Sequence, residues 1–486
     1  MKDKVLWIIL IFGLVFRLIN FESSFFFAHD QDLYSWIAKD IVINHHLRLV
    51  GQLTSVDGVF IGSFYYYLMA AFYYVFKMNP LSAVIPLTII GVFSIWSIYW
   101  VVSKNFSKRS GLVAAFIYAV SLGVVSFDRW SVPTQPTLIW SIWFLAVILG
   151  LGKGNLRYLP LYGFLCGFVW QLHIALLPIL LIPIIAYIVG GHKINLLWDK
   201  KNVRIVLASV SIFVLTMSPF LMFELKHNFL QVKSMAVGIS KNTGGLSGMN
   251  KLVKVIDASG REFQQRFWIG DFVSFSELFW IFLIVMATLL VIYKKIDLRI
   301  LSMFVLWYLL IMLAQFSSKR VVSEYYFTNL VPIYILISAL FIDSFVGKKV
   351  MYFLAGLYFG VNGWWLLTKS DYDQSYRYRR ELVEFVKNDS MVNKFPCIAV
   401  NFISDPGVGV GFRYLFWYYG VDLVKPGTPG VPVYNVPIPW QLSVSESPKQ
   451  FGRFGLLMPV KTKSLINKPD CHKLEYQLDP LLGYTE

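Results

Sequence analysis

Two carboxylates, Asp30 and Asp32, follow the first apolar run of the chain. They belong to the segment 28–40, in which apolar residues recur on one helical face, as in a helix that lies along a membrane surface. The dipole of a helix favours carboxylates at its start, so an N-cap role would explain either residue. A carboxylate held at the mouth of a membrane cavity is also suited to acid–base chemistry. Both interpretations stay open at this point.

The composition places these carboxylates in a membrane protein. Of 486 residues, 57% are hydrophobic and only 15% are charged, which is too apolar for an ordinary globular protein. The net charge of +16 does not indicate nucleic-acid binding, because Lys and Arg mostly separate the apolar runs. The basic start followed by an apolar run resembles a signal peptide. No small-residue cleavage site follows and Arg17 interrupts the run, so we expect an uncleaved first span.

The apolar runs predict a polytopic α-helical protein with about eleven transmembrane helices. The expected spans are 5–21, 80–102, 110–127, 134–151, 158–172, 174–190, 203–223, 278–293, 300–316, 325–346 and 350–367. The run 158–190 is divided because a single helix of that length, about 50 Å, would exceed the ~30 Å hydrocarbon core.

The segment Val59–Phe76 is long enough to cross the membrane, but we expect it to lie flat in the outer interface. If it crossed, the basic loop at 104–109 would lie outside, and every later loop would be inverted. With eleven spans, the N-terminus is cytoplasmic, the tail is outside, and most carboxylates collect on the outer face. The expected location is the plasma (inner) membrane, with a first outer loop over 22–79.

Two further outer segments are expected. The loop 224–277 is long and polar, which is typical of a lid, a binding loop or a disordered segment. The tail, 370–486, reads as a small extracytoplasmic α/β domain, with strands near 397–403 and 421–424 and an irregular part over 426–440. Its cysteines, Cys397 and Cys471, are expected to lie close enough for a disulfide, since the outer compartment is oxidising.

Four short motifs carry a family resemblance. Asp30, Tyr34 and Ala38 match the D-E-x-x-Y-x-x-x-A stretch that follows the first span of GT-C glycosyltransferases, although Gln31 replaces the second acidic residue. The segment 167–173 resembles G-x-x-x-Q-L-H, 219–227 resembles P-x-x-x-F-E-x-x-H, and 323–332 resembles a late H-Y-x-x-x-x-x-P stretch without its His. Residues 5–346 are thus similar to the branch that contains protein O-mannosyltransferases and lipid A aminoarabinose transferases.

The resemblance implies a GT-C transmembrane domain over 1–369 and a hexosyl or pentosyl transferase that is expected to invert. Such an enzyme takes a sugar from a polyprenyl-phosphate or diphosphate carrier and passes it to a lipid, glycan or protein acceptor on the outer face of the bilayer. An acceptor hydroxyl needs a base, for which we choose Asp30. Asp128 is a second catalytic candidate, although Gln135 competes for the family's second acidic position.

The substrate-binding candidates are the remaining motif residues and the cations expected on the outer side, because a phosphate needs cations. They are Asp32, Tyr34, Arg129, His173, Glu224, Lys226, His227, Arg261, Arg266 and Tyr325. Arg129 and at least one of the later cations are expected to point into one cavity between the first loop and the loop 224–277.

Several residues keep a plainer interpretation. Arg17 either pairs with a buried carboxylate or snorkels outward. His173 fits an interface histidine satisfied by Gln171 equally well. Adjacent His45 and His46 point in different directions on a helix, which disfavours a metal site; no cofactor is indicated beyond an open option of a divalent metal. Phe25–Phe27 and the Tyr65–Tyr74 segment either line a groove for the lipid carrier or anchor the protein in the membrane.

A non-enzymatic transporter or scaffold for lipid-linked sugars is the rival class, and an oligosaccharide ligase differs only in its donor. A transporter is expected to show internal repeats and ionisable residues at mid-membrane. We find no clear repeat, and the carboxylates lie at span ends, which favours the enzyme.

Overall fold

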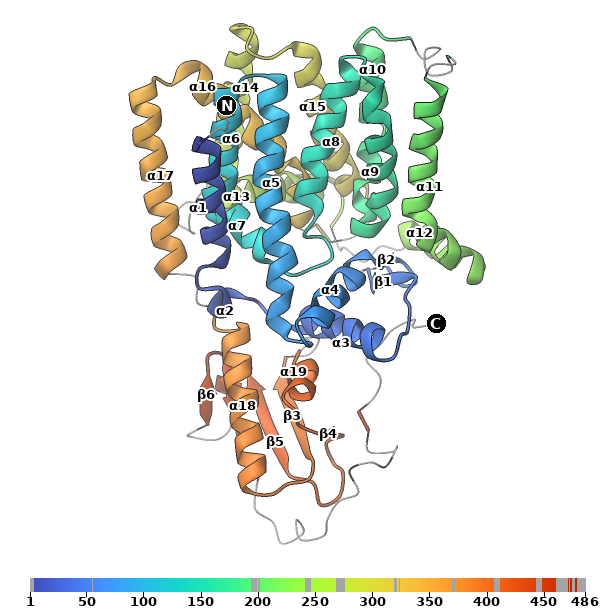
Figure 1. Ribbon diagram of the computed structural model, residues 1–486, viewed down its shortest axis with the longest axis vertical. Coiled ribbons are helices and arrows are strands. Elements are labelled where there is room, and N and C mark those ends of the chain that lie inside the picture. The colour runs from blue at the N-terminus through green and yellow to red at the C-terminus, as the bar shows by residue number, and fades with distance from the viewer. Residues whose placement is uncertain are drawn as a thin grey trace.

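The computed structural model describes residues 4–54, 56–193, 199, 202–240, 246–267, 276–318, 321–322, 324–368, 372–405, 411–442, 448–459, 471, 473 and 477–478, without the side chains of 239, 240, 276–279, 324 and 325. Figure 1 shows a bundle of upright helices with a smaller unit of helices and strands at one end. We call this end of the bundle the domain side.

Each predicted span contains a helix of the bundle. These helices are α1 (Lys4–Leu18), α5 (Val84–Asn105), α6 (Lys108–Val120) with α7 (Leu122–Arg129), α8 (Thr137–Gly152), α9 (Leu159–Leu172), α10 (Ile182–Val189), α11 (Val203–Lys226), α14 (Ser276–Ile292), α15 (Leu298–Ser317), α16 (Val331–Phe345) and α17 (Lys348–Thr368). Within the described ranges, five helices are long and apolar enough to cross a membrane, or six if the pair α6–α7, bent by 61°, is one span. Eleven crossings therefore stay a prediction.

The end of the bundle away from the domain side is rich in basic residues. There the Nζ of Lys104 donates to the Tyr158 hydroxyl (3.0 Å), and Arg109 forms an ion pair with Asp343 (3.1 Å). Lys348 begins α17 at the same end, as Figure 1 shows. This is the distribution that the predicted orientation requires, because positively charged loops stay in the cytoplasm.

The first outer loop forms a layer between the bundle and the smaller unit (Figure 1). It contains α2 (Phe21–Ser24), α3 (His29–Ile43), β1 (Val50–Leu53), β2 (Phe60–Gly62) and α4 (Phe64–Val75). The predicted helix over Val59–Phe76 is too long, since β2 occupies its first residues. The reason lies in distant side chains: Gln231 accepts from the Phe60 N–H (2.7 Å) and Gln171 from the Phe64 N–H (3.1 Å).

The segment 224–277 is largely helical, which corrects the expectation of a loop without clear structure. It holds α12 (Leu230–Ser240) and α13 (Gly248–Phe267), and the predicted flexible tip at 242–248 lies mostly outside the described residues. Val255, Ala258 and Phe263 are buried on one face of α13, against the bundle core. An amphipathic helix of this kind gains stability from burying its apolar face.

The smaller unit is a layer of helices on a short parallel sheet. It comprises α18 (Tyr376–Val392), β3 (Ile398–Ser404), α19 (Arg413–Tyr418), β4 (Leu423–Val424), β5 (Val433–Ile438), β6 (Lys449–Phe451) and β7 (Phe454–Leu456). The parallel strands have the order β4–β3–β5, with Val400 opposite Tyr434. The first two strands agree with the prediction, whereas β5 lies in the part expected to be irregular.

The first-loop layer and the smaller unit share one hydrophobic core. Phe25 and Phe27 are fully buried, with ring centroids 6.2 and 6.0 Å from Tyr376 of α18. Tyr73 of α4 lies 5.7 Å from Tyr414 of α19. Phe25, Phe27 and Tyr73 are therefore core residues that neither line a carrier groove nor anchor the chain in a bilayer. Phe26 and Tyr74 are exposed, so both interpretations stay open for them.

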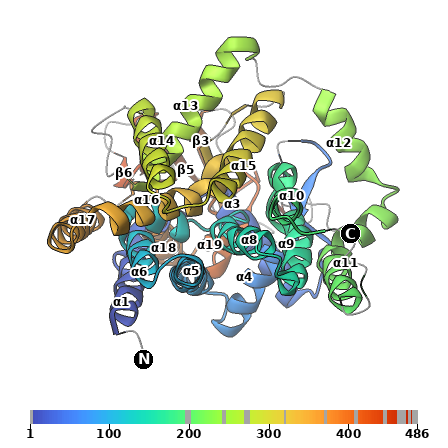
Figure 2. The same ribbon diagram turned by 90° about the horizontal axis from the view of Figure 1, so that it is seen from above.

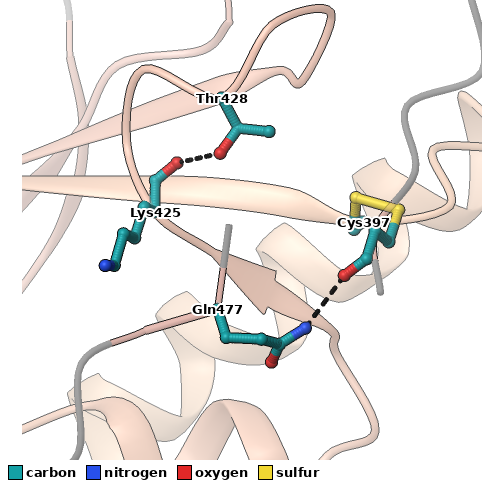
Figure 3. The surroundings of a disulfide bond; sticks show 5 residues. Cys397, Lys425, Thr428 and Gln477 are labelled. Atoms are coloured by element: carbon teal, nitrogen blue, oxygen red, sulfur yellow. Dashed lines mark hydrogen bonds between the residues drawn. A yellow bond between two sulfur atoms is a disulfide. The ribbon is translucent and has the colours of Figure 1, made fainter. Parts of the chain in front are cut away.

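A disulfide joins Cys397, at the start of β3, to Cys471, as predicted; their Cα atoms are 5.9 Å apart. Figure 3 shows the bond beside Gln477, whose side-chain amide donates to the Cys471 carbonyl (3.0 Å). A bridge of this type stabilises a small domain by about 2–4 kcal/mol.

Candidate active site

Asp30 lies in the first turn of α3, where it is half-buried. It is not the N-cap, because Ala28 takes that position and its N–H donates to the Gln31 side chain (2.9 Å). Oδ1 of Asp30 instead accepts a hydrogen bond from the Gln52 amide in β1 (2.9 Å). Among the described residues no other group donates to this carboxylate, so one oxygen stays available.

Asp32 has a different environment although it is only two residues away. It is 3% exposed, and its two oxygens accept the backbone N–H groups of Arg413 (3.2 Å) and Tyr414 (2.7 Å) at the start of α19. Burial raises the pKa of Asp32 to about 6, against the lowering effect of those N–H groups and of Arg379. Asp32 therefore joins α3 to the smaller unit, and its assignment to substrate binding stays a prediction.

Asp128 is sealed inside the bundle. Its Oδ2 pairs with Arg17 of α1 through Nε (2.9 Å) and Nη2 (2.5 Å), and its Oδ1 accepts from the Tyr118 hydroxyl (3.2 Å). Asp128 and Arg17 are each 1% exposed. Arg17 thus pairs rather than snorkels. These partners occupy its oxygens and favour a structural role, and the catalytic role of Asp128 stays a prediction.

Tyr34 belongs to a buried polar network beneath Asp30. Its hydroxyl lies 2.5 Å from Oγ of Ser131, which also contacts the Tyr65 hydroxyl (2.8 Å). Gln31 donates to the Ser131 carbonyl (2.6 Å), and Ser35 contacts the Tyr73 hydroxyl (2.8 Å). Burial raises the pKa values of Tyr34, Tyr65 and Tyr73, so all three stay neutral hydroxyls. The network fixes α3 against α4 and the bundle, and Tyr34 positions the site rather than contacting substrate.

Glu224 closes a helix end, and its assignment to substrate binding stays a prediction. It is 2% exposed, and its carboxylate accepts the N–H groups of Gln231 (3.1 Å) and Val232 (3.2 Å) in the first turn of α12. Lys226 is exposed at the end of α11, and the His227 ring stacks 4.2 Å from Phe223. Phe223 packs with Val50 of β1, so this helix end adjoins the strand that carries Gln52.

The two arginines of α13 are held by carboxylates. Arg266 forms hydrogen bonds to both oxygens of Glu262 (2.7 and 3.0 Å) and donates to the Gly123 carbonyl (2.9 Å). Arg261 forms an ion pair with Asp257 (2.9 Å) at the helix surface. Their charges are balanced within the protein.

Arg129 lines a cavity with residues of α2 and α17, and none of the other predicted cations lines it. Figure 2 places α17 and α11, which ends at Lys226, on opposite edges of the bundle. The predicted cavity shared by Arg129 and a later cation stays a prediction.

His173 begins the short helix η3 (Ile174–Ile179), where its Nδ1 accepts from the Ala175 N–H (3.1 Å). Gln171 does not satisfy it, because its side chain contacts Phe64 and Thr216 instead. Tyr325 lies in η5 (Glu324–Leu330), and its side chain is outside the described part of the structure.

Over the described ranges there is no group of three or more His, Cys, Asp or Glu residues that could hold a metal ion. His46 contacts Asp40 (3.2 Å), which also pairs with Arg48 (2.5 Å).

Two residues of the site were missed from the sequence. Gln52 holds Asp30, and Ser131 joins the tyrosine network to the bundle. Neither residue type nor spacing distinguishes them from other polar loop residues. Only the fold brings them to α3.

The comparisons with known proteins agree with this architecture. Residues 63–223 match the family model described as dolichyl-phosphate-mannose-protein mannosyltransferase. No curated protein is similar enough in sequence to count as a match. The fold is that of the GT-C glycosyltransferases, so the resemblance stated from the motifs is confirmed.

The similar solved structures include ArnT from Cupriavidus metallidurans bound to undecaprenyl phosphate, at 10% identity and a TM-score of 0.63, covering 93% of this chain and 98% of that chain. The apo state of the same protein matches at 9% identity and a TM-score of 0.63, covering 93% and 97%. The Archaeoglobus fulgidus oligosaccharyltransferase AglB, in complex with an inhibitory peptide and a dolichol-phosphate, matches at 12% identity and a TM-score of 0.45, covering 89% and 69%.

Proposed function

We propose that the protein is an integral membrane glycosyltransferase with Asp30 as its general base. It transfers a sugar from a polyprenyl-phosphate or diphosphate donor to an acceptor hydroxyl on the extracytoplasmic face of the plasma membrane. The GT-C fold and the family match over residues 63–223 support the class of enzyme. The undecaprenyl phosphate bound to ArnT supports the class of donor.

The state of the carboxylates is the observation that carries the proposal. Both oxygens of Asp32 accept backbone N–H groups, and Asp128 pairs with Arg17. Asp30 keeps one oxygen free among the described residues. A general base must be reached by the proton that it takes. Of these three carboxylates, Asp30 alone meets that condition.

In the proposed reaction the free oxygen of Asp30 takes the proton of the acceptor hydroxyl. The acceptor oxygen attacks the anomeric carbon while the bond from that carbon to the donor phosphate breaks, which inverts the configuration. The carrier leaves with its phosphate and the bonding electron pair. Gln52 orients the carboxylate by holding Oδ1.

The donor phosphate needs a cation on the same side of the molecule. Lys226 is exposed and has no carboxylate partner among the described residues, in contrast to Arg261 and Arg266. It ends the helix in which Phe223 packs on β1, so we assign the contact with the donor phosphate to Lys226.

Sugar transfer by purified, folded variants tests the base. Asn cannot take the proton, so Asp30→Asn is expected to fold normally and to lose on the order of 10²–10⁴ in rate. Asp57→Asn is the matched control, because Asp57 is an exposed carboxylate of the same loop. Near wild-type turnover by Asp30→Asn would remove the catalytic role. Sugar transport without transfer by the wild type would replace the enzyme with a transporter.

A further inference from the structure

The cavity that Arg129 lines is at the domain side of the bundle, and Asp30 is not among its lining residues. It has a volume of about 310 Å³ and is bounded by α2, α7 and the outer end of α17. The lining residues are Ser24, Phe26, Leu122, Ser126, Arg129, Trp130, Trp365, Leu366 and Tyr372. The set contains one cation, three hydroxyl groups and mostly apolar or aromatic walls, and it includes neither Asp30 nor Gln52.

Arg129 carries a buried charge that the protein does not balance. Four arginines of the described part are buried: Arg17, Arg48, Arg129 and Arg379. The first two form ion pairs with aspartates, and Arg379 lies in the field of Asp32. Arg129 is 7% exposed and has no carboxylate partner among the described residues. A buried guanidinium without an anion is costly, so this position is suited to an external anion.

The guanidinium of Arg129 also has hydrogen-bonding capacity to spare. One Nη donates to the Ile19 carbonyl, and the Phe21 ring lies 5.4 Å from the guanidinium carbon. Its Nε is buried and has no partner in the part of the chain that the structure describes. A planar guanidinium matches the oxygens of a phosphate, and the hydroxyl of Ser126 is a further donor in the lining.

The walls indicate that the anion belongs to a lipid. Phe26, Trp130 and Trp365 give the cavity aromatic sides of the kind that meet membrane headgroups. The adjoining helix α17 is long and apolar enough to span a membrane. Only 11% of its 18-residue apolar stretch is buried inside the protein. The volume is at the low end for ligand pockets, so it suits a headgroup whose apolar chain leaves along α17.

We propose that this cavity binds the phosphate headgroup of a membrane lipid, with Arg129 as its cation. The site is separate from the base of the proposed transfer reaction. Its ligand is either a polyprenyl phosphate or an anionic phospholipid, which present the same charged group on an apolar chain.

Binding of farnesyl phosphate to the purified full chain, measured by titration calorimetry in neutral detergent, tests the proposal. Arg129→Gln is expected to weaken binding on the order of 10- to 100-fold, since it removes a charge-assisted contact. Arg129→Lys should weaken binding less, because it keeps the charge without the planar fork. Ser126→Ala gives a second, milder probe of the same cavity should Arg129→Gln fail to fold.

Three controls make the outcome specific. Arg380→Gln changes an arginine that pairs with Glu22 of α2 outside the cavity, so it should bind like the wild type. Lys226→Gln removes the cation assigned to the donor phosphate and should leave the Arg129-dependent binding in place, which separates this site from the donor site of the proposed function. Competition by phosphatidylglycerol in nanodiscs would support the site and identify the lipid as a phospholipid. Equal binding by wild type and Arg129→Gln, or equal binding of farnesol or inorganic phosphate, would overturn it.

Discussion

The first turn of α3 and the contact between α1 and α7 both place a carboxylate near the domain side, with opposite results. Asp128 is 1% exposed and surrounded by Arg17 and Tyr118, whereas Asp30 is half-buried and has only Gln52 as a partner among the described residues. The same side chain is therefore a structural element in one region and a reactive candidate in the other. What decides between them is how many of its oxygens the fold already uses.

Substitutions in the buried pair of Arg17 and Asp128 should change the free energy of unfolding. Arg17→Met leaves the charge of Asp128 buried without its cation, so we expect a loss of about 3–5 kcal/mol in the free energy of unfolding. Unfolding in mixed micelles measures it. The double variant Arg17→Met with Asp128→Leu should recover most of the loss, because it removes both charges. A single variant as stable as the wild type would mean that the pair is exposed to water.

Asp32 extends the comparison of Asp30 and Asp128 to a second carboxylate of α3. The pH dependence of the free energy of unfolding reports its ionisation. Its pKa rises from 3.8 to about 6 on folding. Between these values the folded protein holds a proton that the unfolded chain has lost. The contribution of Asp32 to stability is therefore complete below pH 4 and falls as the pH rises through 6, by at most about 3 kcal/mol.

Asp32→Asn removes this titration. Relative to the wild type, the variant should become more stable as the pH rises from 4 to 7.5, which unfolding curves at both pH values would measure. Asp57→Asn, at an exposed position, should show no such trend. A difference between Asp32→Asn and wild type that does not change with pH would contradict the raised pKa.

Local patterns predicted much of the fold because the signals are themselves local. Apolar runs marked every segment that holds a helix of the bundle, and two cysteines in a polar tail marked the disulfide. The failures are contacts between distant segments. Arg17 and Asp128 are 111 residues apart, and Asp32 caps a helix 381 residues away. The side chains that hold β2 and α4 come from α9 and α12. The apolar segment Val59–Phe76, taken alone, therefore predicted a helix that is too long.

The candidate site was predicted in the same uneven way. The motif around Asp30 marked the first turn of α3, but it did not indicate that Asp32, Tyr34 and Glu224 are buried and hydrogen-bonded within the protein. Family motifs record residue types and not their partners, so a capping carboxylate and a reactive one look alike in the sequence. Gln52, which has no motif, was missed for the same reason.

Gln52 gives the smallest and most diagnostic effect. Gln52→Leu removes the hydrogen bond that orients Asp30 but leaves the base itself, so we expect kcat to fall about 3- to 10-fold, the value of one ordinary hydrogen bond. KM should not change, because Gln52 is a positioning residue and not a substrate contact. Thr54→Val, just after β1, is the control and should leave both constants unchanged. A fall in kcat as large as that of Asp30→Asn would make Gln52 part of the chemistry. No fall at all would mean that the bond does not orient the carboxylate, and the first turn of α3 would then hold its base by packing alone.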